Sequence, residues 1–169
     1  MRHSFPASIW RMCMGSALLL CMLLGGCQTP PLYRGLTQTQ VKALRSEGFQ
    51  ETEQGFEFGS SEPILFEFDR YNLKPDVRRT VERIGHTLVS VGLTSVRVYG
   101  YTDGAGTDAY DVRLSKRRAE TVAIELVDTG LAASRVDTIG KGKRDPVGDN
   151  RTAAGRAQNR RAAIVVSTR

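Results

Sequence analysis

Side chains that commonly carry out catalysis are scarce in this sequence. Among its 169 residues are only 2 histidines and 3 cysteines. His86, the histidine outside the first thirty residues, stands between Ile84 and Leu88 in a helical pattern, where a partly buried structural histidine is more common than a catalytic base. No Cys–His pair or Ser–His–Asp triad can be assembled around it. We therefore expect no enzyme activity and no cofactor.

Acidic residues with the spacing of a metal site are also missing. Asp103, Asp108 and Asp111 bear a superficial likeness to a calcium-binding loop, but the alternating Asp/Asn spacing and the closing glutamate are absent. The GKG stretch at 140–142 lacks the strand-to-helix context of a phosphate-binding loop. We expect no metal, and we interpret GKG as a turn.

The sequence has no hydrophobic run long enough to span a bilayer. Two arginines, Arg2 and Arg11, precede an apolar stretch at residues 12–24. This stretch is too short for a stable span and is typical of a secretory signal. The following Leu24-Gly25-Gly26-Cys27 resembles the bacterial lipobox, in which the cysteine thiol takes a diacylglycerol. These features predict a lipoprotein signal peptide at 1–26 and lipidation, palmitate included, at Cys27. A plain signal peptide followed by a stray cysteine is the alternative.

Acylation at Cys27 predicts a chain that is anchored to a bilayer without crossing it. Gln28 replaces the aspartate that retains lipoproteins at the inner membrane of enteric bacteria, so we expect the periplasmic face of the outer membrane. Cys13 and Cys21 lie in the predicted signal peptide, which leaves the mature chain with one cysteine and no internal disulfide.

The net charge is mildly basic. Removal of residues 1–26 takes away Arg2 and Arg11 and no acidic residue, which lowers the formal charge from +6 to +4. Such a balance suits an anionic wall polymer or lipid. The predicted periplasmic location argues against nucleic acid as a partner.

The segment between the anchor and the main domain divides into two parts. Residues 27–36 contain two prolines and a glycine without periodicity, and predict an extended tether. Residues 37–59 predict a short helix that begins with a capping box, followed by a hairpin. This segment is too small for a core of its own, so its apolar side chains must pack on the main domain or on a partner: Leu44, Phe49, Phe56 and Phe58.

Residues 60–169 show the regular pattern of one α+β domain. Alternating or compact apolar stretches predict strands. Apolar residues spaced by three and four predict two helices, of which the first starts near Pro75 and the second ends at Gly130. This order predicts a mixed sheet with both helices on one face. The expected strands are 64–68, 96–101, 135–141 and 162–167, with a turn of helix at 156–160.

The stretch GYTDGAGTDAYDVRLSKRRAETV at 100–122 has the features of a recognition site. Asp103 follows a predicted strand directly, which is a usual position for a binding loop. Lys116, Arg117 and Arg118 point about 100° apart around a helix, so only one of them can face the loop. An acid beside a guanidinium is complementary to a ligand that carries both ammonium and carboxylate. An internal Asp–Arg ion pair that joins loop to helix explains the pattern equally well.

This stretch and DNRTAAGRAQNRRAAIVV at 149–166 resemble the OmpA-like domain family, which includes the C-terminal domains of OmpA, Pal and MotB. The resemblance covers roughly residues 60–169. It implies a βαβαββ mixed sheet with helices packed on one face, here preceded by a short helix and hairpin. It also implies noncovalent binding of peptidoglycan through the diaminopimelate of the stem peptide.

The family's binding residues can be transferred to matching positions. Asp103 would take the ligand's ammonium and Arg118 its carboxylate. The sequence departs from the family at Tyr101, where a histidine is usual, and at Asp111, where an asparagine is usual; the second change replaces a donor and acceptor by an acceptor that adds charge. The other residues assigned to the site are Phe68, Asp69, Leu114, Thr107 and Asp111. Asn159, Arg160 and Arg156 are expected to hold the turn before the last strand.

The segment GLTQTQVKALRSEGFQETEQGFEFGSS, ahead of the domain, resembles the YfiB family of outer-membrane lipoproteins. That resemblance implies a periplasmic partner, the inhibitor YfiR, whose sequestration would release a diguanylate cyclase and raise cyclic di-GMP. Leu44, Phe49 and Phe56 are the expected partner-binding residues; the alternative is that they cover the domain's own sheet. A purely structural anchor between outer membrane and peptidoglycan is the second interpretation of function. A homodimer is also considered.

Overall fold

The computed structural model describes residues 32–60 and 62–167. The predicted signal peptide, Cys27 and most of the predicted tether therefore lie outside the described residues. Within the described ranges, no helix is long and apolar enough to cross a membrane.

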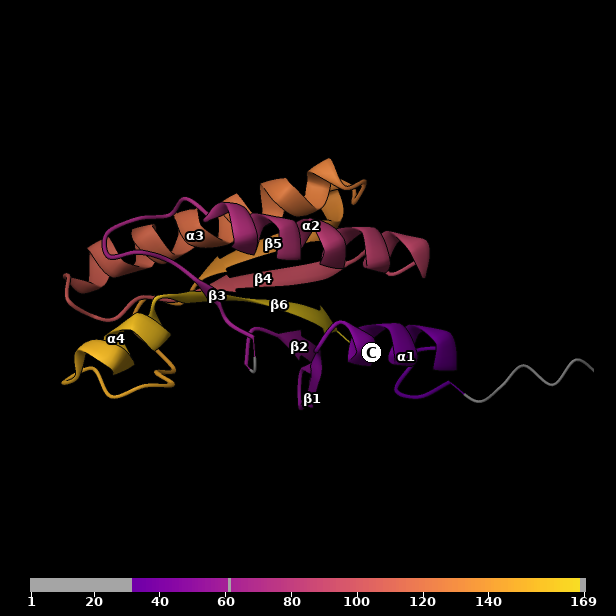
Figure 1. Cartoon of the computed structure of the whole chain (residues 1–169), viewed down its shortest axis with the longest axis horizontal. Coiled ribbons are helices and arrows are strands. Elements are labelled where there is room, and N and C mark those ends of the chain that lie inside the picture. Colours follow the sequence, from indigo (N-terminus) through magenta and orange to yellow (C-terminus); the bar gives the residue numbers. More distant parts are fainter. Residues whose placement is uncertain (1–31, 61, 168–169) are drawn as a thin grey trace, which may run out of the picture. The chain divides into compact units, whose positions relative to one another are not determined.

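The described residues form one mixed α+β unit (Figure 1). The sheet has the strand order β1-β2-β6-β4-β5, and β3 also pairs with β6. Strands β4 and β5 are parallel and the other pairs are antiparallel, which confirms the predicted mixed sheet. The elements are α1 (Gln38–Ser46), β1 (Gln50–Thr52), β2 (Gly55–Phe58), β3 (Ile64–Leu65), α2 (Pro75–Ser90), β4 (Val96–Gly100), α3 (Asp108–Asp128), a 3-10 turn (Ala133–Arg135), β5 (Val136–Gly140), α4 (Ala153–Asn159) and β6 (Arg161–Ser167).

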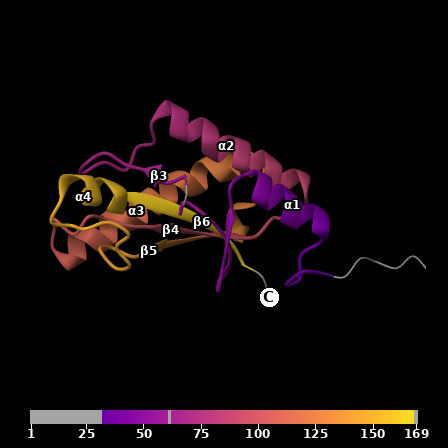
Figure 2. The same cartoon turned by 60° about the horizontal axis from the view of Figure 1, so that its bottom comes forward.

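Helices α2 and α3 lie on the same face of the sheet, as the sequence predicts (Figures 1 and 2). The central strand β6 shows why the two faces differ, because successive side chains of a strand point to opposite faces. Ile164 and Val166 belong to the main core under the helices. Val165 belongs to a smaller cluster on the other face, together with Tyr99 and Tyr101.

The β1–β2 hairpin extends the main core. Phe56 and Phe58 lie opposite Val166 and Ile164 in the β2–β6 register, so they face the same side of the sheet. Both phenylalanines are buried, and the ring of Phe58 lies 5.6 Å from that of Phe49. In this conformation the hairpin therefore covers the domain's own sheet.

Helix α1 begins with the predicted capping box and is held to α2 by a few contacts. Its apolar side, which includes the buried Leu44, joins the core. The Gln40 side chain donates to the backbone oxygen of Val91 at 3.0 Å. Glu47, the C-cap residue of the helix, accepts from the Thr87 hydroxyl at 2.7 Å and from Arg83. The polar contacts between these two helices are thus concentrated near the C-terminal end of α2.

The prediction of a strand over residues 64–68 is wrong in extent. Only Ile64 and Leu65 pair with β6, and the last bond of this edge runs from the Phe66 N–H to the Arg160 oxygen at 2.9 Å. Beyond it the chain leaves the sheet, and Asp69 adopts a positive φ of 56°. The alternation of apolar residues continues past Leu65, but the backbone turns away to form one wall of a cavity.

Two glycines allow α3 to lie very close to the sheet. Gly100 and Gly140 are partners in the β4–β5 register. A Cβ atom on Gly100 would lie 1.9 Å from the backbone oxygen of Ser115, and one on Gly140 would lie 2.6 Å from that of Val112. Strand and helix backbones are therefore in direct contact, and this contact positions the first half of α3 over the ends of β4 and β5.

We expect Gly100→Ala to lower the free energy of unfolding by about 1–3 kcal/mol, because the added methyl group overlaps helix backbone that cannot move without repacking. Urea unfolding followed by circular dichroism measures this loss. Gly92→Ala is the control: Gly92 has a φ of 72° and nothing within 4 Å of an added Cβ, so it reports the cost of the backbone conformation alone, about 1 kcal/mol. A Gly100→Ala protein as stable as the wild type would contradict this close contact.

Candidate functional site

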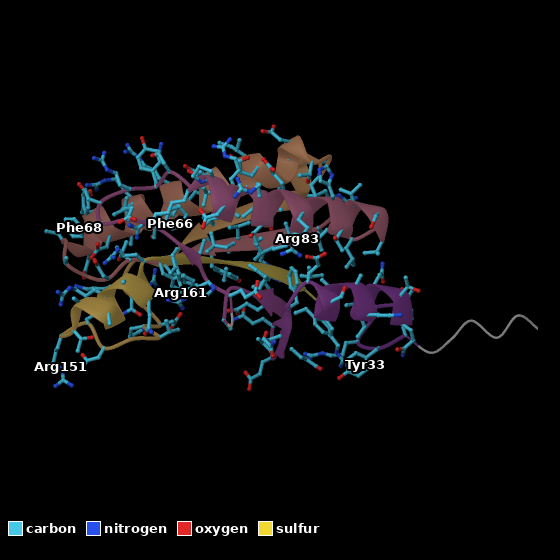
Figure 3. All side chains as sticks on the ribbon, in the orientation of Figure 1. Tyr33, Phe66, Phe68, Arg83, Arg151 and Arg161 are labelled. Carbon is cyan, nitrogen blue, oxygen red and sulfur yellow. The ribbon has the colours of Figure 1, made fainter. Side chains whose placement is uncertain are left out.

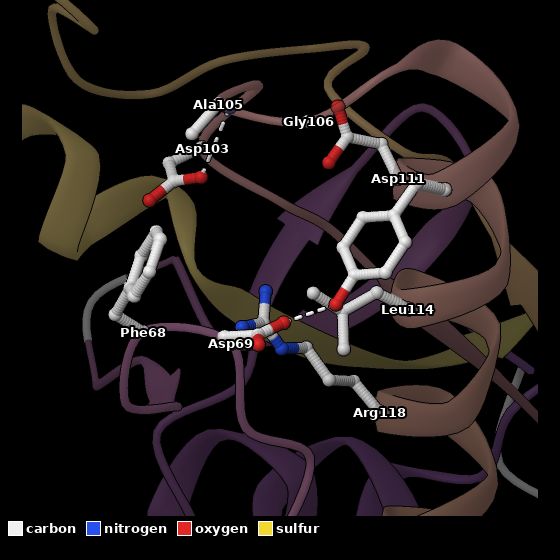
Figure 4. A pocket seen from close by; sticks show the side chains of 9 residues that line it. Phe68, Asp69, Asp103, Ala105, Gly106, Asp111, Leu114 and Arg118 are labelled. Carbon is white, nitrogen blue, oxygen red and sulfur yellow. Dashed lines mark hydrogen bonds between the residues drawn. The ribbon is translucent and has the colours of Figure 1, made fainter.

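A cavity of about 380 Å³ opens where α3 begins (Figure 4). Its walls come from the loop between β3 and α2, the loop between β4 and α3, and the first turns of α3. It brings together six of the seven residues that the sequence assigns to the binding site. The lining residues are Phe68, Asp69, Asp103, Ala105, Gly106, Tyr110, Asp111, Leu114 and Arg118.

Arg118 forms the floor of the cavity and is completely buried. Its guanidinium donates to three backbone oxygens: Nε to Arg70 at 2.8 Å, Nη1 to Tyr101 at 2.8 Å and Nη2 to Glu67 at 3.2 Å. Burial lowers the pKa of Arg118 to about 10, partly offset by the charge of Asp103. The group therefore stays cationic at neutral pH, and it joins the β3–α2 loop to the end of β4.

The ion pair of Asp103 is not made with the basic run on α3. Its Oδ2 accepts from Nη1 of Arg160 at 3.1 Å, and its Oδ1 accepts from the Ala105 N–H at 3.3 Å. Of the basic run, Lys116 donates to the Thr138 oxygen and Arg117 lies over the Tyr71 ring, so only Arg118 faces the cavity. The loop after β4 is thus held by an arginine from the end of α4.

The outer wall is formed by exposed side chains. Phe68 is 65% exposed and lies at the same end of the unit as the start of α3 (Figure 3). Asp69 accepts a hydrogen bond from the Tyr110 hydroxyl, and this bond raises the pKa of Tyr110. Leu114 supplies an apolar side wall (Figure 4).

Asp111 has an unusual environment for a carboxylate. It is 2% exposed, and among the described residues no hydrogen-bond partner exists for its Oδ2. The hydroxyl of the buried Thr102 lies against this carboxylate and has no other hydrogen-bond partner in the described part of the chain. Burial raises the pKa of Asp111, while the nearby Thr102 hydroxyl and the charge of Lys143 act in the opposite direction.

Several residues lie away from the cavity or have a different part in it than the sequence indicates. Thr107 does not line the cavity; it is the N-cap of α3 and accepts from the Tyr110 N–H. His86 is exposed on α2. Asn159 accepts from the Val147 and Gly148 N–H groups, as expected for a residue that holds this turn. The sequence assigns Arg160 to the same turn, and the structure shows that its side chain also donates to Asp103.

Tyr110 is a cavity residue that the sequence analysis missed. It stands two residues after the start of α3, in the stretch DAYD, and its ring and hydroxyl reach Asp69 across the cavity. The signal available was its position one helical turn before Leu114, which places both side chains on one face.

Substitution Asp111→Asn should raise the free energy of unfolding at neutral pH by about 1 kcal/mol, because a buried carboxylate without a full set of donors is less favourable than a neutral amide. The folded-state pKa of Asp111 is raised, so its carboxyl favours folding below the ordinary pKa and loses this contribution as pH rises through the raised value. The gain from the amide should therefore shrink in acid. Urea unfolding at several pH values measures it.

The control for that substitution is Asp103→Asn, which breaks an ion pair and should destabilise the protein at neutral pH. If Asp111→Asn were equally destabilising, the Asp111 carboxylate would have partners that stabilise it, contrary to its environment in the structure.

Comparisons with known proteins agree with this architecture. Residues 65–160 match the OmpA family. The chain is 42% identical over 147 residues to the outer-membrane lipoprotein YfiB of Pseudomonas aeruginosa, covering 87% of this chain and 88% of that protein. It is 39% identical over 148 residues to the putative lipoprotein YfiB of Escherichia coli, covering 87% and 91%. These relatives confirm the predicted outer-membrane location.

Solved structures confirm the predicted fold. The peptidoglycan-associated lipoprotein from Burkholderia pseudomallei superposes with a TM-score of 0.58 at 30% identity, over 61% of this chain and 87% of that one. The C-terminal domain of Helicobacter pylori MotB, at 24% identity, superposes with a TM-score of 0.59 over 64% and 85%. By sequence and by structure, the chain belongs to the OmpA family.

Proposed function

We propose that this chain binds peptidoglycan noncovalently, and that the cavity between Asp103 and Arg118 receives the free amino-acid end of diaminopimelate in the stem peptide. The observation that best supports this proposal is that a buried guanidinium and carboxylates line one small cavity with an exposed aromatic wall. A group that carries both ammonium and carboxylate is complementary to that arrangement.

The hydrogen-bonding capacity of Arg118 supports this proposal. A guanidinium has five N–H groups, and the three backbone oxygens account for one bond each from Nε, Nη1 and Nη2. One N–H on each terminal nitrogen remains to bind a carboxylate. The three backbone bonds fix the orientation of the group before a ligand arrives, which reduces the entropy lost on binding.

The size of the cavity supports an amino-acid end as the ligand. About 380 Å³ is at the small end of the range for ligand pockets. A glycan strand or a complete stem peptide exceeds it. Among the relatives, the Burkholderia lipoprotein is peptidoglycan-associated by name.

The anchor and the tether would set where this binding takes place. Lipidation at Cys27 would hold the chain to the outer membrane, and the roughly ten residues of tether would extend about 30 Å at most. The domain would then connect the outer membrane to the wall.

A signalling role would use the segment at 37–59. The relationship to the YfiB lipoproteins supports capture of the periplasmic inhibitor YfiR, with activation of a diguanylate cyclase as the result. Leu44, Phe49 and Phe56 are all buried in the core, so contact with a partner requires release of the segment. Release of α1 exposes Leu44, whereas Phe56 becomes free only if β2 leaves β6. A structural anchor without signalling needs neither step.

Replacement of the exposed aromatic wall tests peptidoglycan binding without disturbing the core. Phe68→Ala should weaken co-sedimentation with purified peptidoglycan by about tenfold, because a stacked aromatic side chain commonly contributes more than 1 kcal/mol to binding. Ile124→Ala is a matched control, since Ile124 is similarly exposed, 60% against 65%, and lies outside the cavity. Equal sedimentation of the two variants would contradict the assigned site.

Destabilisation of α1 tests the link between signalling and wall binding. Leu44→Pro breaks α1 at a cost of about 3 kcal/mol or more and should increase both the capture of purified YfiR and the co-sedimentation with peptidoglycan. Glu47→Ala, which removes the contacts to Arg83 and Thr87, should act in the same direction with a smaller effect. Lys42→Ala, at an exposed position of the same helix, should change neither. The coupling is wrong if Leu44→Pro increases neither activity.

A further inference from the structure

Exposed aromatic side chains gather beside the cavity. Among the described residues, the exposed tyrosines and phenylalanines are Tyr33, Phe68, Tyr71 and Tyr110. Phe68 and Tyr110 line the cavity, and Tyr71 follows Phe68 on the same loop between β3 and α2. Single exposed apolar residues are common, but aromatic side chains grouped around a pocket are typical of a binding surface.

The guanidinium of Arg117 is stacked on one of these rings. Its central carbon lies 5.5 Å from the centroid of the Tyr71 ring, a cation–π contact that joins α3 to the β3–α2 loop. A guanidinium stacked in this way keeps the N–H groups along its edge free, and within residues 32–60 and 62–167 no side-chain hydrogen bond or ion pair uses them. Arg117 is therefore an oriented donor without an acceptor.

The surroundings of Arg117 are cationic. Arg113 stands one turn earlier on the same side of α3, and Arg70 lies in the loop that Arg117 contacts. Both are exposed, and neither has an acidic partner in the part of the chain that the structure describes. The nearby acids are already engaged, since Glu67 has a lysine partner and Asp69 is bonded to a tyrosine (Figure 4). An anionic group of a ligand would balance this charge.

Arg117 is contiguous with the cavity through Tyr110. Residues seven positions apart on a helix lie on the same face, two turns from each other. The hydrogen bond to Asp69 raises the pKa of Tyr110, while the charges of Arg118 and Arg117 act in the opposite direction, so both arginines lie near that hydroxyl. A ligand held at Arg118 can therefore extend past Tyr110 to Arg117.

We infer that Arg117, held in place by Tyr71, is a second anion site that binds a carboxylate of the stem peptide outside diaminopimelate. The glutamate that precedes diaminopimelate in the stem peptide carries such a carboxylate. The inference rests on the proposed function and deepens it, because the cavity accounts only for the amino-acid end of diaminopimelate. Tyr71 is a positioning residue: its ring orients the guanidinium, whose edge matches a carboxylate with two parallel hydrogen bonds.

Titration calorimetry with the full-length protein in detergent tests the inference. The probes are meso-diaminopimelate, the tripeptide L-Ala-γ-D-Glu-meso-diaminopimelate, and the same tripeptide with the glutamate carboxylate amidated. Arg117→Gln should bind the acidic tripeptide about fivefold more weakly than the wild type, the effect of one exposed charge pair. It should bind the other two probes as the wild type does.

Arg135→Gln is the matched control, because it removes the same charge from another exposed arginine. Arg135 directly precedes β5, so it lies at the end of the parallel β4–β5 pair opposite to the cavity. This variant should bind all the probes as the wild type does.

Tyr71 is tested by a conservative replacement. Tyr71→Ala should weaken binding of the acidic tripeptide about threefold, because Arg117 loses the ring that orients it. Tyr71→Phe keeps the ring and should bind as the wild type does. At about 0.5 M salt the preference of the wild type for the acidic tripeptide over its amidated form should shrink, since exposed charges are screened. Circular dichroism checks that each variant is folded.

The outcomes separate the inference from the proposed function. If the wild type binds diaminopimelate but Arg117→Gln binds the acidic tripeptide equally tightly, Arg117 is not a carboxylate site and the cavity itself stands. The same conclusion follows if the wild type binds both tripeptides alike, or if Arg117→Gln loses as much affinity for diaminopimelate alone. If Tyr71→Phe is as weak as Tyr71→Ala, the positioning by the ring is overturned. If the folded wild type binds none of the probes, the proposed function fails, and the inference fails with it.

Discussion

A buried guanidinium holds the walls of the cavity together. Arg118 donates to the backbone oxygens of Glu67 and Arg70 on one side and of Tyr101 on the other. A charge removed from water is tolerated only when its hydrogen bonds are made. The β3–α2 loop and the end of β4 must therefore stay close to α3, and these are the walls from which Phe68, Asp69 and Asp103 project.

The close contact between α3 and the sheet makes that arrangement possible. Side chains at Gly100 or Gly140 would separate the helix from β4 and β5. Without them, Ser115 is fully buried, and its hydroxyl accepts from the Gly142 N–H at 2.9 Å. The same packing that stabilises the domain thus sets the distance between Arg118 and the loop that carries Asp103. The stability of the domain and the geometry of the cavity therefore both depend on how closely α3 packs against the sheet.

In the segment at 37–59, packing competes with the proposed role, whereas the packing of α3 supports the geometry of the cavity. Leu44, Phe49 and Phe56 contribute to the core that covers the sheet, and each would have to leave it to meet a partner. The burial of an apolar side chain of this size is worth about 1.5–3 kcal/mol. A partner must offer comparable apolar surface in return, so the segment can act as a switch only between two well-packed states.

The sequence by itself determined the fold class, because periodicity and capping residues are local properties of the chain, and its motifs, through their resemblance to the OmpA-like family, pointed to most of the cavity residues. Tertiary structure alone decided that Arg160 and not the basic run on α3 pairs with Asp103, that the edge strand ends after Leu65, and that Asp111 is buried. Each of these depends on groups that lie far apart in sequence. Whether such a side chain is buried, and which groups it can bond to, is set only when the folded chain brings those groups together.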